Sequence, residues 1–499
     1  MLTRISVKRL LLAILGGVVS YFAYPSPDIW IAIIPSIVVL YLSVRGLTFW
    51  RGVLVGLVGG FTFFVAQIYW ISQYLGPVPL IALAGLQAVI FAVFAGVMAL
   101  VSQANRVVVA EAAGVAILWV GREYVSTHWP YGGFPWSRVA MSQANSPLAS
   151  WVSIGGFGLL SFLLVFLSLW VALSLSKKAR SQSLISSAAS FGTVFMAVGI
   201  AAIPVANSGT MDIAGVQGNA NAGLFANTSR GEILLNHLDA TERLLEQKTR
   251  PDLVVWPENA SDINPDDDVD VRLTMENLVN DKLQTPFIFG TITSEGDEIF
   301  NSSKLWLPGR GEVDQYDKKR PVPFGEYVPD RDFFYALSPD LVGMISRGYS
   351  FGNRDGIFNV GPTDVGVLIC FEEAIDELPR EIVLQGASVL VAQTNNADFG
   401  RSDESVQQNA IARLRAIETG RSLVSVSTVG PSVIFDPKGK ILASTRAYES
   451  AVLRAEVPLS NELTIAMRGG WLFDPACAAG SALISVLVVV ERRRKTTKL

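Results

Sequence analysis

The sequence has few cysteines, few histidines and little charge for its length. Among its 499 residues, the only cysteines are Cys370 and Cys477, and the only histidines are His128 and His237. This scarcity excludes a disulfide-rich scaffold and a cysteine-based zinc cluster, and it leaves few ligands for a histidine-bound metal. Charged residues make up 17% of the chain, against about 25% in soluble proteins, which argues against an ordinary soluble enzyme. We expect no metal ion, no cofactor and no nucleic-acid partner.

The charge that is present is distributed unevenly. The formal net charge is -4, yet residues 207–469 hold 39 acidic and 24 basic residues, whereas the remainder holds 5 acidic and 16 basic residues. Two chemically different bodies are therefore joined in one chain. We predict a membrane domain at residues 1–206, an extracytoplasmic catalytic domain at residues 207–469, and a last span with a basic tail at residues 470–499.

Long apolar segments support the membrane prediction. A bilayer core of about 30 Å needs about 20 apolar residues per helix, and residues 52–105 alone carry no charge. The first segment could be a signal peptide, but the spans that follow favour a retained helix. The sequence predicts eight spans, at residues 9–24, 28–44, 52–73, 80–102, 106–121, 150–175, 184–206 and 471–490.

Basic residues in the short loops predict the orientation of these spans. With a cytoplasmic N-terminus, 14 basic residues fall on the cytoplasmic side, whereas only Arg122 and Arg138 fall opposite. Cytoplasmic loops of membrane proteins are enriched in Lys and Arg, so this parity supports the fifth span although Glu111 lies within it. Both termini would then be cytoplasmic, and residues 207–469 would lie outside.

A transporter or channel is the alternative for such a membrane body. These proteins carry charged residues in mid-membrane along their substrate paths, and Glu111 is the one candidate within the predicted spans. We therefore favour a membrane anchor and substrate platform.

Residues 207–469 read as one α/β domain. Short β-branched runs alternate with helical patterns at 231–248 and 405–421, which favours sheets packed under helices. The runs lie at residues 213–216, 253–256, 287–291, 304–307, 365–371, 388–393, 423–426, 432–435 and 452–457.

Three potentially reactive side chains follow predicted strands or enter a stiff loop. They are Glu258, Cys370 and Lys318. A helix opening after Cys370 would lower the thiol pKa, a desolvated carboxylate could take the thiol proton, and a lysine could stabilise an oxyanion. Each residue alone also fits a bland role: a core cysteine, a solvated carboxylate or a basic surface.

The motifs around these residues resemble the nitrilase superfamily. They are Trp256-Pro257-Glu258, the stretch from Tyr316-Asp317-Lys318 to Val322-Pro323-Phe324-Gly325-Glu326, and Ile369-Cys370-Phe371-Glu372. With the eight predicted spans, they are similar to the membrane-embedded branch of apolipoprotein N-acyltransferases. The resemblance covers essentially the whole chain.

The resemblance implies an αββα sandwich at the outer face of the bacterial plasma membrane. It implies transfer of an acyl chain from a phospholipid, through a cysteine thioester, to the N-terminal amine of a diacylglyceryl-cysteine lipoprotein. Glu258 would be the general base, Cys370 the nucleophile and Lys318 the oxyanion partner. Glu326 and Glu372 would be supporting carboxylates, and the backbone N–H of Phe371 would complete the oxyanion hole.

The chain departs from the family pattern beside these residues. Asn396 and Asp398 stand where the family often reads Asn-Asp-Ala-Trp-Phe-Gly, Gln408 replaces a common His, and Phe371 replaces a common Tyr. These departures leave the three reactive residues intact and concern substrate contacts.

The apolar stretch at 333–345 has two possible roles. It could pack in the core, or it could form an arm that lies over the site and touches lipid.

Two rival functions are a membrane-anchored amidase and a non-enzymatic membrane protein. Eight spans bring no advantage to an amidase, and the intact Glu258, Lys318 and Cys370 argue against a non-enzymatic protein.

Overall fold

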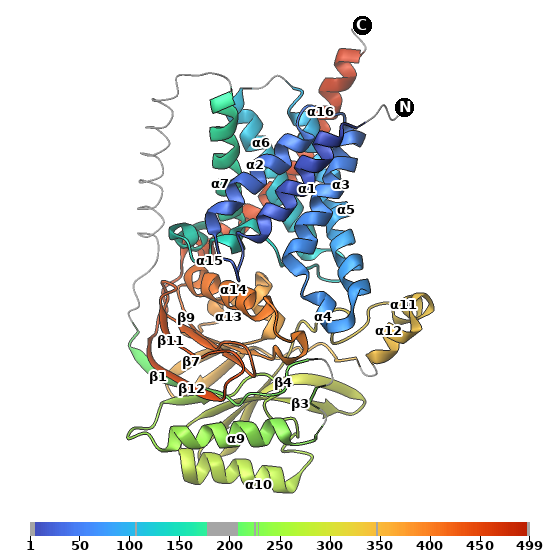
Figure 1. The fold of residues 1–499 in the computed structure, drawn as a ribbon. Coiled ribbons are helices and arrows are strands. Elements are labelled where there is room, and N and C mark those ends of the chain that lie inside the picture. Colours follow the sequence, from blue (N-terminus) through green and yellow to red (C-terminus); the bar gives the residue numbers. More distant parts are fainter. Residues whose placement is uncertain are drawn as a thin grey trace. The chain divides into compact units, whose positions relative to one another are not determined.

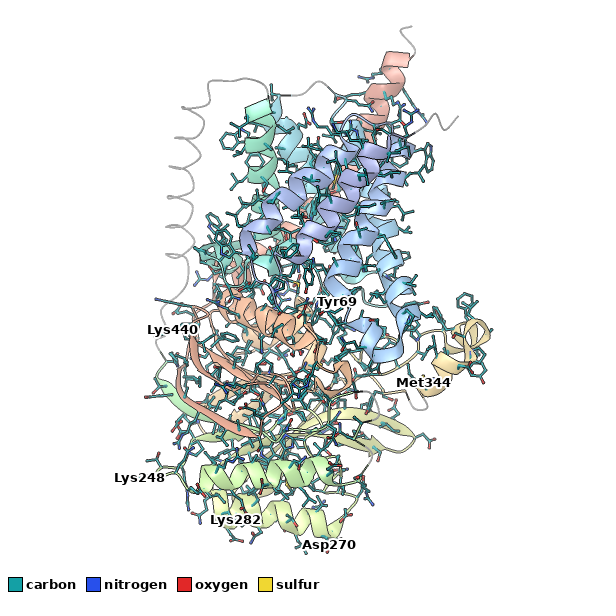
Figure 2. All side chains as sticks on the ribbon, in the orientation of Figure 1. Tyr69, Lys248, Asp270, Lys282, Met344 and Lys440 are labelled. Carbon is teal, nitrogen blue, oxygen red and sulfur yellow. The ribbon has the colours of Figure 1, made fainter. Side chains whose placement is uncertain are left out.

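The chain folds into two compact units in a computed structural model (Figure 1) that describes residues 5–104, 107–176, 208–223, 226–227, 229–345 and 348–496. The first unit comprises Met1–Ser72, Gly76–Ile203 and Thr464–Leu499. The second comprises Gln73–Leu75 and Pro204–Leu463, which include the labelled residues Lys248, Asp270, Lys282, Met344 and Lys440 of Figure 2.

The first unit is helical. Four helical segments in the described part of the chain are long and apolar enough to cross a membrane: Phe49–Ile68, Pro77–Val101, Pro147–Leu175 and Gly470–Arg494. The α-helices are α1 (Val7–Tyr21), α2 (Ile33–Val44), α3 (Phe49–Ile68), α5 (Pro77–Val101), α6 (Val108–His128), α7 (Val152–Ser176), α15 (Ile465–Arg468) and α16 (Phe473–Thr496), and the short α4 (Ile71–Leu75) contributes its last three residues to the second unit.

Four long spans are fewer than the eight predicted. The segment predicted at 28–44 is a shorter apolar helix, Trp30–Val44, and that at 9–24 is the 15-residue α1. The segment predicted at 106–121 is α6, a 21-residue helix that carries several charges. The segment at 184–206 lies outside the described residues.

Small residues allow the long helices to pack closely. On α3, a Cβ added at Gly56 would lie 2.4 Å from the Cβ of Ala95 on α5, and one added at Gly52 would lie 2.9 Å from that of Ala99. Close backbone approach through small residues is a common way for helices to associate in lipid. Gly52 and Gly56 therefore allow α3 to lie close to α5.

Glu111, the charge that weakened the fifth predicted span, is paired. It lies in the first turn of α6, accepts a hydrogen bond from the Tyr41 hydroxyl at 2.6 Å, and binds Arg45 through Nε at 2.6 Å. A paired carboxylate at a helix end needs no substrate path to explain it.

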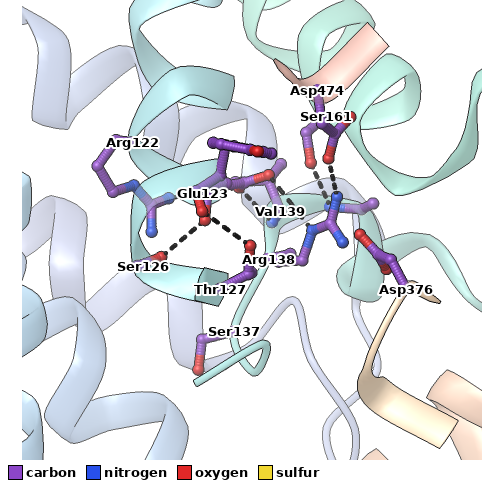
Figure 3. Close-up of polar contacts among 12 residues, drawn as sticks. Arg122, Glu123, Ser126, Thr127, Ser137, Arg138, Val139, Ser161, Asp376 and Asp474 are labelled. Atoms are coloured by element: carbon purple, nitrogen blue, oxygen red, sulfur yellow. Dashed lines mark hydrogen bonds and ion pairs between the residues drawn. The ribbon is translucent and has the colours of Figure 1, made fainter. Parts of the chain in front are cut away.

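A second charged group lies inside this unit (Figure 3). Arg122 and Arg138 were predicted in short loops, but α6 runs through Arg122, and both side chains are buried. The guanidinium of Arg138 donates to Asp474 of α16 at 2.6 Å, and Glu123 accepts from the backbone N–H of Val139 at 2.9 Å. These contacts hold α6, the segment after it and α16 together.

The second unit contains two six-stranded sheets. Their strand orders are β12-β1-β2-β3-β4-β5 and β11-β10-β9-β8-β7-β6. Strands β1, β2 and β3 are mutually parallel, as are β7, β8 and β9, while the outer pairs are antiparallel. The strands are β1 (Thr210–Gln217), β2 (Leu253–Val255), β3 (Phe287–Glu295), β4 (Glu298–Leu307), β5 (Gly311–Asp317), β6 (Ile357–Val360), β7 (Thr363–Ile369), β8 (Val389–Thr394), β9 (Ser422–Ser427), β10 (Val433–Phe435), β11 (Ile441–Ser444) and β12 (Ala451–Pro458).

Alternating side chains build two separate cores in this unit. On β2, Leu253 and Val255 point into the core between the two sheets, whereas Val254 points to the core beneath the helices. Successive strand residues face opposite sides of a sheet, and apolar residues on both sides allow each sheet to be buried on both faces. This is why the strands read as continuous apolar runs.

Helices cover the outer face of each sheet (Figure 1). Helices α9 (Glu232–Leu245) and α10 (Val269–Asn277) pack on the first sheet, and α13 (Glu377–Leu384) and α14 (Glu404–Thr419) on the second. The expected αββα sandwich is confirmed. The nine predicted strands are all present, and β5, β6 and β11 are additional.

Candidate active site

The three predicted reactive residues follow strands of the sandwich. Glu258 follows β2, Lys318 directly follows β5, and Cys370 directly follows β7. Glycine on the neighbouring β3 makes room for the turn that carries Glu258, because a Cβ at Gly290 would lie 2.7 Å from the Cα of Glu258. The fold thus supports Glu258 and Cys370 from buried strands, and Lys318 from the buried end of the edge strand β5.

Glu258, Lys318 and Glu326 form one buried cluster. The Nζ of Lys318 lies 3.4 Å from Oε1 of Glu258, and 3.0 Å and 2.9 Å from the two carboxylate oxygens of Glu326. Asn301 donates from Nδ2 to Glu258 at 2.7 Å and to Glu326 at 2.9 Å. The backbone N–H of Val322 fixes the other Glu326 oxygen at 2.6 Å.

Burial and charge set the protonation of this cluster. Burial raises the pKa of Glu258, the Lys318 ammonium opposes that rise, and the carboxylate of Glu326 adds to it. Burial alone would lower the pKa of Lys318, but Glu326 and Glu258 outweigh burial and hold its pKa well above the ordinary value. The lysine therefore stays charged beside a carboxylate with raised proton affinity, which suits a general base.

Cys370 corrects one expectation from the sequence. The segment that it opens is a five-residue 3-10 helix, Cys370–Ala374, and α13 begins only at Glu377. Burial raises the pKa of the thiol well above its ordinary value, the Glu258 carboxylate adds to that rise, and Lys318 opposes it. A five-residue helix is too short for its dipole to offset the effect of burial on the thiol pKa. The thiol therefore stays neutral until a base removes its proton.

The backbone at Cys370 is left-handed, with φ of +54°. Residues with a Cβ rarely adopt this conformation, and strained positions of this kind concentrate at functional sites. The chain therefore turns sharply at Cys370, directly after the end of β7.

Glu372 fastens the Lys318 loop to the Cys370 strand. One of its oxygens accepts from the backbone N–H groups of Lys319 at 2.8 Å and Arg320 at 3.1 Å, while the other accepts from Ile369 at 2.9 Å. The Tyr316 hydroxyl lies 3.0 Å from both oxygens. Glu372 therefore sets the relative positions of two reactive residues from different strands.

Phe371 is the second residue of the 3-10 helix, and its predicted role as backbone oxyanion donor stays a prediction. Asn301, Tyr316 and Gln408 are polar residues beside the site for which no role was predicted from the sequence. The side chain of Gln408 donates to the sulfur of Cys370 at 3.7 Å. A buried amide in a strand or helix has no sequence signature that separates it from an ordinary structural residue.

The apolar stretch at 333–345 forms two short helices, α11 (Arg331–Leu337) and α12 (Pro339–Met344). Phe333 and Leu337 are 61% and 67% exposed, so core packing does not account for them. Phe334 makes an edge-to-face contact with Phe324 of the loop that carries Glu326. We call residues 331–344 the apolar arm.

Among the described residues, no group of three or more His, Cys, Asp or Glu side chains could hold a metal ion.

Family models and relatives agree with this arrangement. Residues 16–170 match the apolipoprotein N-acyltransferase N-terminal domain, and residues 212–462 match carbon-nitrogen hydrolase. An apolipoprotein N-acyltransferase of Mycolicibacterium smegmatis is 28% identical over 97% of this chain and 85% of its own length. One of Geobacter metallireducens is 28% identical over 97% of this chain and 96% of its own length.

Among solved structures, an amidase from Nesterenkonia sp. is similar, with 17% identity, a TM-score of 0.39, and coverage of 53% of this chain and 95% of its own.

The carbon-nitrogen hydrolase model matches residues 212–462, which are half of the sequence and contain Glu258, Lys318 and Cys370. The chain belongs to the carbon-nitrogen hydrolase family, joined to the N-terminal domain of apolipoprotein N-acyltransferases.

Proposed function

We propose that the protein is a membrane acyltransferase that moves an acyl chain from a phospholipid to the N-terminal amine of a diacylglyceryl-cysteine lipoprotein. The observation that carries the proposal is the Glu258–Lys318–Glu326 cluster beside the half-buried Cys370, in a chain whose helical unit matches the N-terminal domain of apolipoprotein N-acyltransferases. A family of hydrolases provides the thioester chemistry, and the membrane unit brings it to lipid.

The first half-reaction forms the thioester. Glu258 takes the proton from the Cys370 thiol, and the sulfur attacks the ester carbonyl carbon of the phospholipid. Lys318, and the backbone N–H of Phe371, stabilise the resulting oxyanion. The ester C–O bond then breaks, and Glu258 returns the proton to the departing oxygen of the lysophospholipid.

The second half-reaction transfers the acyl chain. The neutral amine of the acceptor attacks the thioester carbonyl, and Glu258 takes a proton from the nitrogen. The C–S bond then breaks, and Glu258 passes this proton to the sulfur, which restores the Cys370 thiol. The two substrates react in turn, so the kinetics are ping-pong. Water must be excluded between the two steps, because it would hydrolyse the thioester.

We further propose eight spans, with both termini cytoplasmic and residues 207–469 outside the inner membrane of a bacterium. The charge asymmetry of the short loops supports this orientation. In that arrangement the apolar arm contributes exposed Phe333 and Leu337 to a lipid-facing surface.

The deciding experiment is incubation of the purified protein with phospholipid alone, followed by mass spectrometry of the peptide that contains Cys370. An acyl group on Cys370 that passes to an added diacylglyceryl lipopeptide supports the proposal. Release of ammonia from small amides without acylation by phospholipid would instead support the amidase alternative. Cys370→Ala is the control, and an N-acylated lipopeptide produced by that variant contradicts the proposal.

A further inference from the structure

A chain of buried amides and carboxylates lies behind the nucleophile in the second unit. It links Cys370 to Gln408 and Glu404 of α14 and to Asn396, which follows β8. Gln408, Glu404 and Asn396 are each at most 3% exposed. None of them belongs to the cluster formed by Glu258, Lys318 and Glu326.

The hydrogen bonds fix which way each amide faces. The oxygen of Asn396 accepts from the Ser427 hydroxyl at 2.5 Å. Its Nδ2 donates to Glu404 at 2.8 Å and to Oε1 of Gln408 at 2.6 Å. Because the carboxamide of Gln408 presents its oxygen to Asn396, its NH2 group must be the end that meets the sulfur of Cys370, at 3.7 Å.

We propose that Gln408 is a positioning residue for Cys370. The side-chain N–H of Gln408 orients the Cys370 sulfur and stabilises its thiolate in both half-reactions. The thiolate exists twice, once before attack on the donor ester and once when it leaves the thioester. An imidazole at this position could gain or lose a proton in the neutral range, whereas a glutamine amide remains a neutral donor at every pH.

The charges around the sulfur explain why such a donor matters. Glu258, Glu404 and Glu326 each disfavour the thiolate electrostatically, whereas Lys318 favours it. Burial raises the pKa of Glu404 to about 8, an effect that the hydrogen bond from Asn396 opposes and the charge of Glu258 reinforces. The side chain of Gln408 also donates to Glu373, a carboxyl group whose pKa is raised by burial and by the charge of Glu404, so the amide contacts both this carboxyl group and the sulfur.

The test compares alkylation of Cys370 by iodoacetamide across pH in the full-length protein, with the Cys370 peptide quantified by mass spectrometry. In Gln408→Met, which keeps the length of the side chain but removes its N–H, we expect the apparent thiolate pKa to rise by about one unit, a tenfold lower thiolate fraction. Asn409→Ala is the matched control, because Asn409 lies on the same helix and donates to the carbonyl of Pro431 at 2.6 Å.

A second variant protects the test against misfolding. Gln408→Glu is nearly isosteric and places a carboxylate at the sulfur, so it should raise the apparent pKa further than Gln408→Met. An alkylation profile unchanged from wild type in a folded Gln408 variant overturns the inference.

The inference concerns a step of the proposed function, and the two fail differently. If wild-type protein never forms an acyl-thioester from phospholipid, the proposed function fails, whereas the alkylation profile still decides the role of Gln408. If wild type forms the thioester and Gln408→Met forms it about tenfold more slowly, both stand. Thioester formation at the wild-type rate in Gln408→Met would contradict the positioning role.

Discussion

Single residues decide the chemistry through their burial. Cys370 and Glu258 are acids whose pKa values are both raised by burial, so neither matches its behaviour in water. The sequence identified both residues because each ends a recognisable strand motif. It could not give the direction of the thiol pKa shift, because that direction depends on a desolvation that the whole fold creates and on carboxylates distant in sequence.

Glu258 is the proposed base of the acylation step. In Glu258→Gln the side chain can no longer accept the thiol proton, and we expect acyl-thioester formation to fall by about a hundredfold to ten-thousandfold. The rate of label transfer from an acyl-labelled phospholipid to Cys370 measures it. Glu298→Gln, at an exposed position of β4, is the control, and a rate near that of wild type in Glu258→Gln would remove the base from this position.

At the scale of elements, the strands and helices were predictable from alternation and periodicity, whereas the contacts between their ends were not. Glu372 joins the end of β5 to the end of β7, although 53 residues separate it from Lys319. Asn301 joins two carboxylates from different loops in the same way. Such contacts follow from sheet order, which sequence patterns do not specify.

Removal of Glu372 should loosen both strand ends. Glu372→Ala leaves the Tyr316 hydroxyl and three backbone N–H groups without their acceptor, and an unsatisfied buried group costs about 1–3 kcal/mol. We expect a lower midpoint of thermal unfolding and loss of acyl transfer. Glu381→Ala, which removes a partly exposed ion pair with Lys319, should change the midpoint little. An unchanged midpoint in Glu372→Ala would show that solvent replaces the carboxylate.

Helix α9 carries a pH-sensitive contact with the first sheet. Burial lowers the pKa of His237 from 6.5 to about 4, and the ring packs 5.4 Å from that of Trp256. The unfolded chain therefore binds a proton more readily, so stability is lost as pH falls through 6.5 toward 4, by about 1.4 kcal/mol between pH 7.5 and 5.5. Thermal unfolding of wild type and His237→Phe at these two pH values measures the effect. An equal loss in both proteins would assign the pH dependence to other groups.

The apolar arm should act on lipid rather than on folding. Phe333 and Leu337 are exposed, so their replacement by Ser removes little packing. We expect Phe333→Ser/Leu337→Ser to keep the wild-type unfolding midpoint and to lower acyl transfer from phospholipid vesicles several-fold. Leu235→Ser, at an exposed position on α9, is the control, and unchanged transfer by the arm variant would exclude a lipid contact there.

At the scale of the whole molecule, charge and hydropathy predicted a membrane unit and an α/β unit. The number of spans was harder to predict, because charges of α6 are paired inside the unit: Glu111 with Arg45, and Glu123 with Arg122 and Arg138. Arg45 lies 66 residues from Glu111, so the sequence of α6 alone does not reveal the pair. Composition alone therefore does not show which charges of a helix are neutralised by partners.

The proposed orientation can be tested with introduced cysteines. We expect a membrane-impermeant maleimide to label a cysteine at Gly296, in the turn between β3 and β4, in spheroplasts with sealed inner membranes. A cysteine at Arg492, near the end of α16, should be labelled only after the membrane is opened. Labelling of both sites in sealed spheroplasts would place the two on one side and refute the orientation.

The pairing of β1 with β12 has a consequence for the history of such a chain. The two strands run antiparallel from Thr210 opposite Pro458 to Gln217 opposite Ala451, so the second unit begins and ends at the same place. A domain whose two ends meet can be inserted into a host protein at a single point without opening its own core. The sandwich is therefore a self-contained domain that one insertion between two helices could transfer from one membrane protein to another.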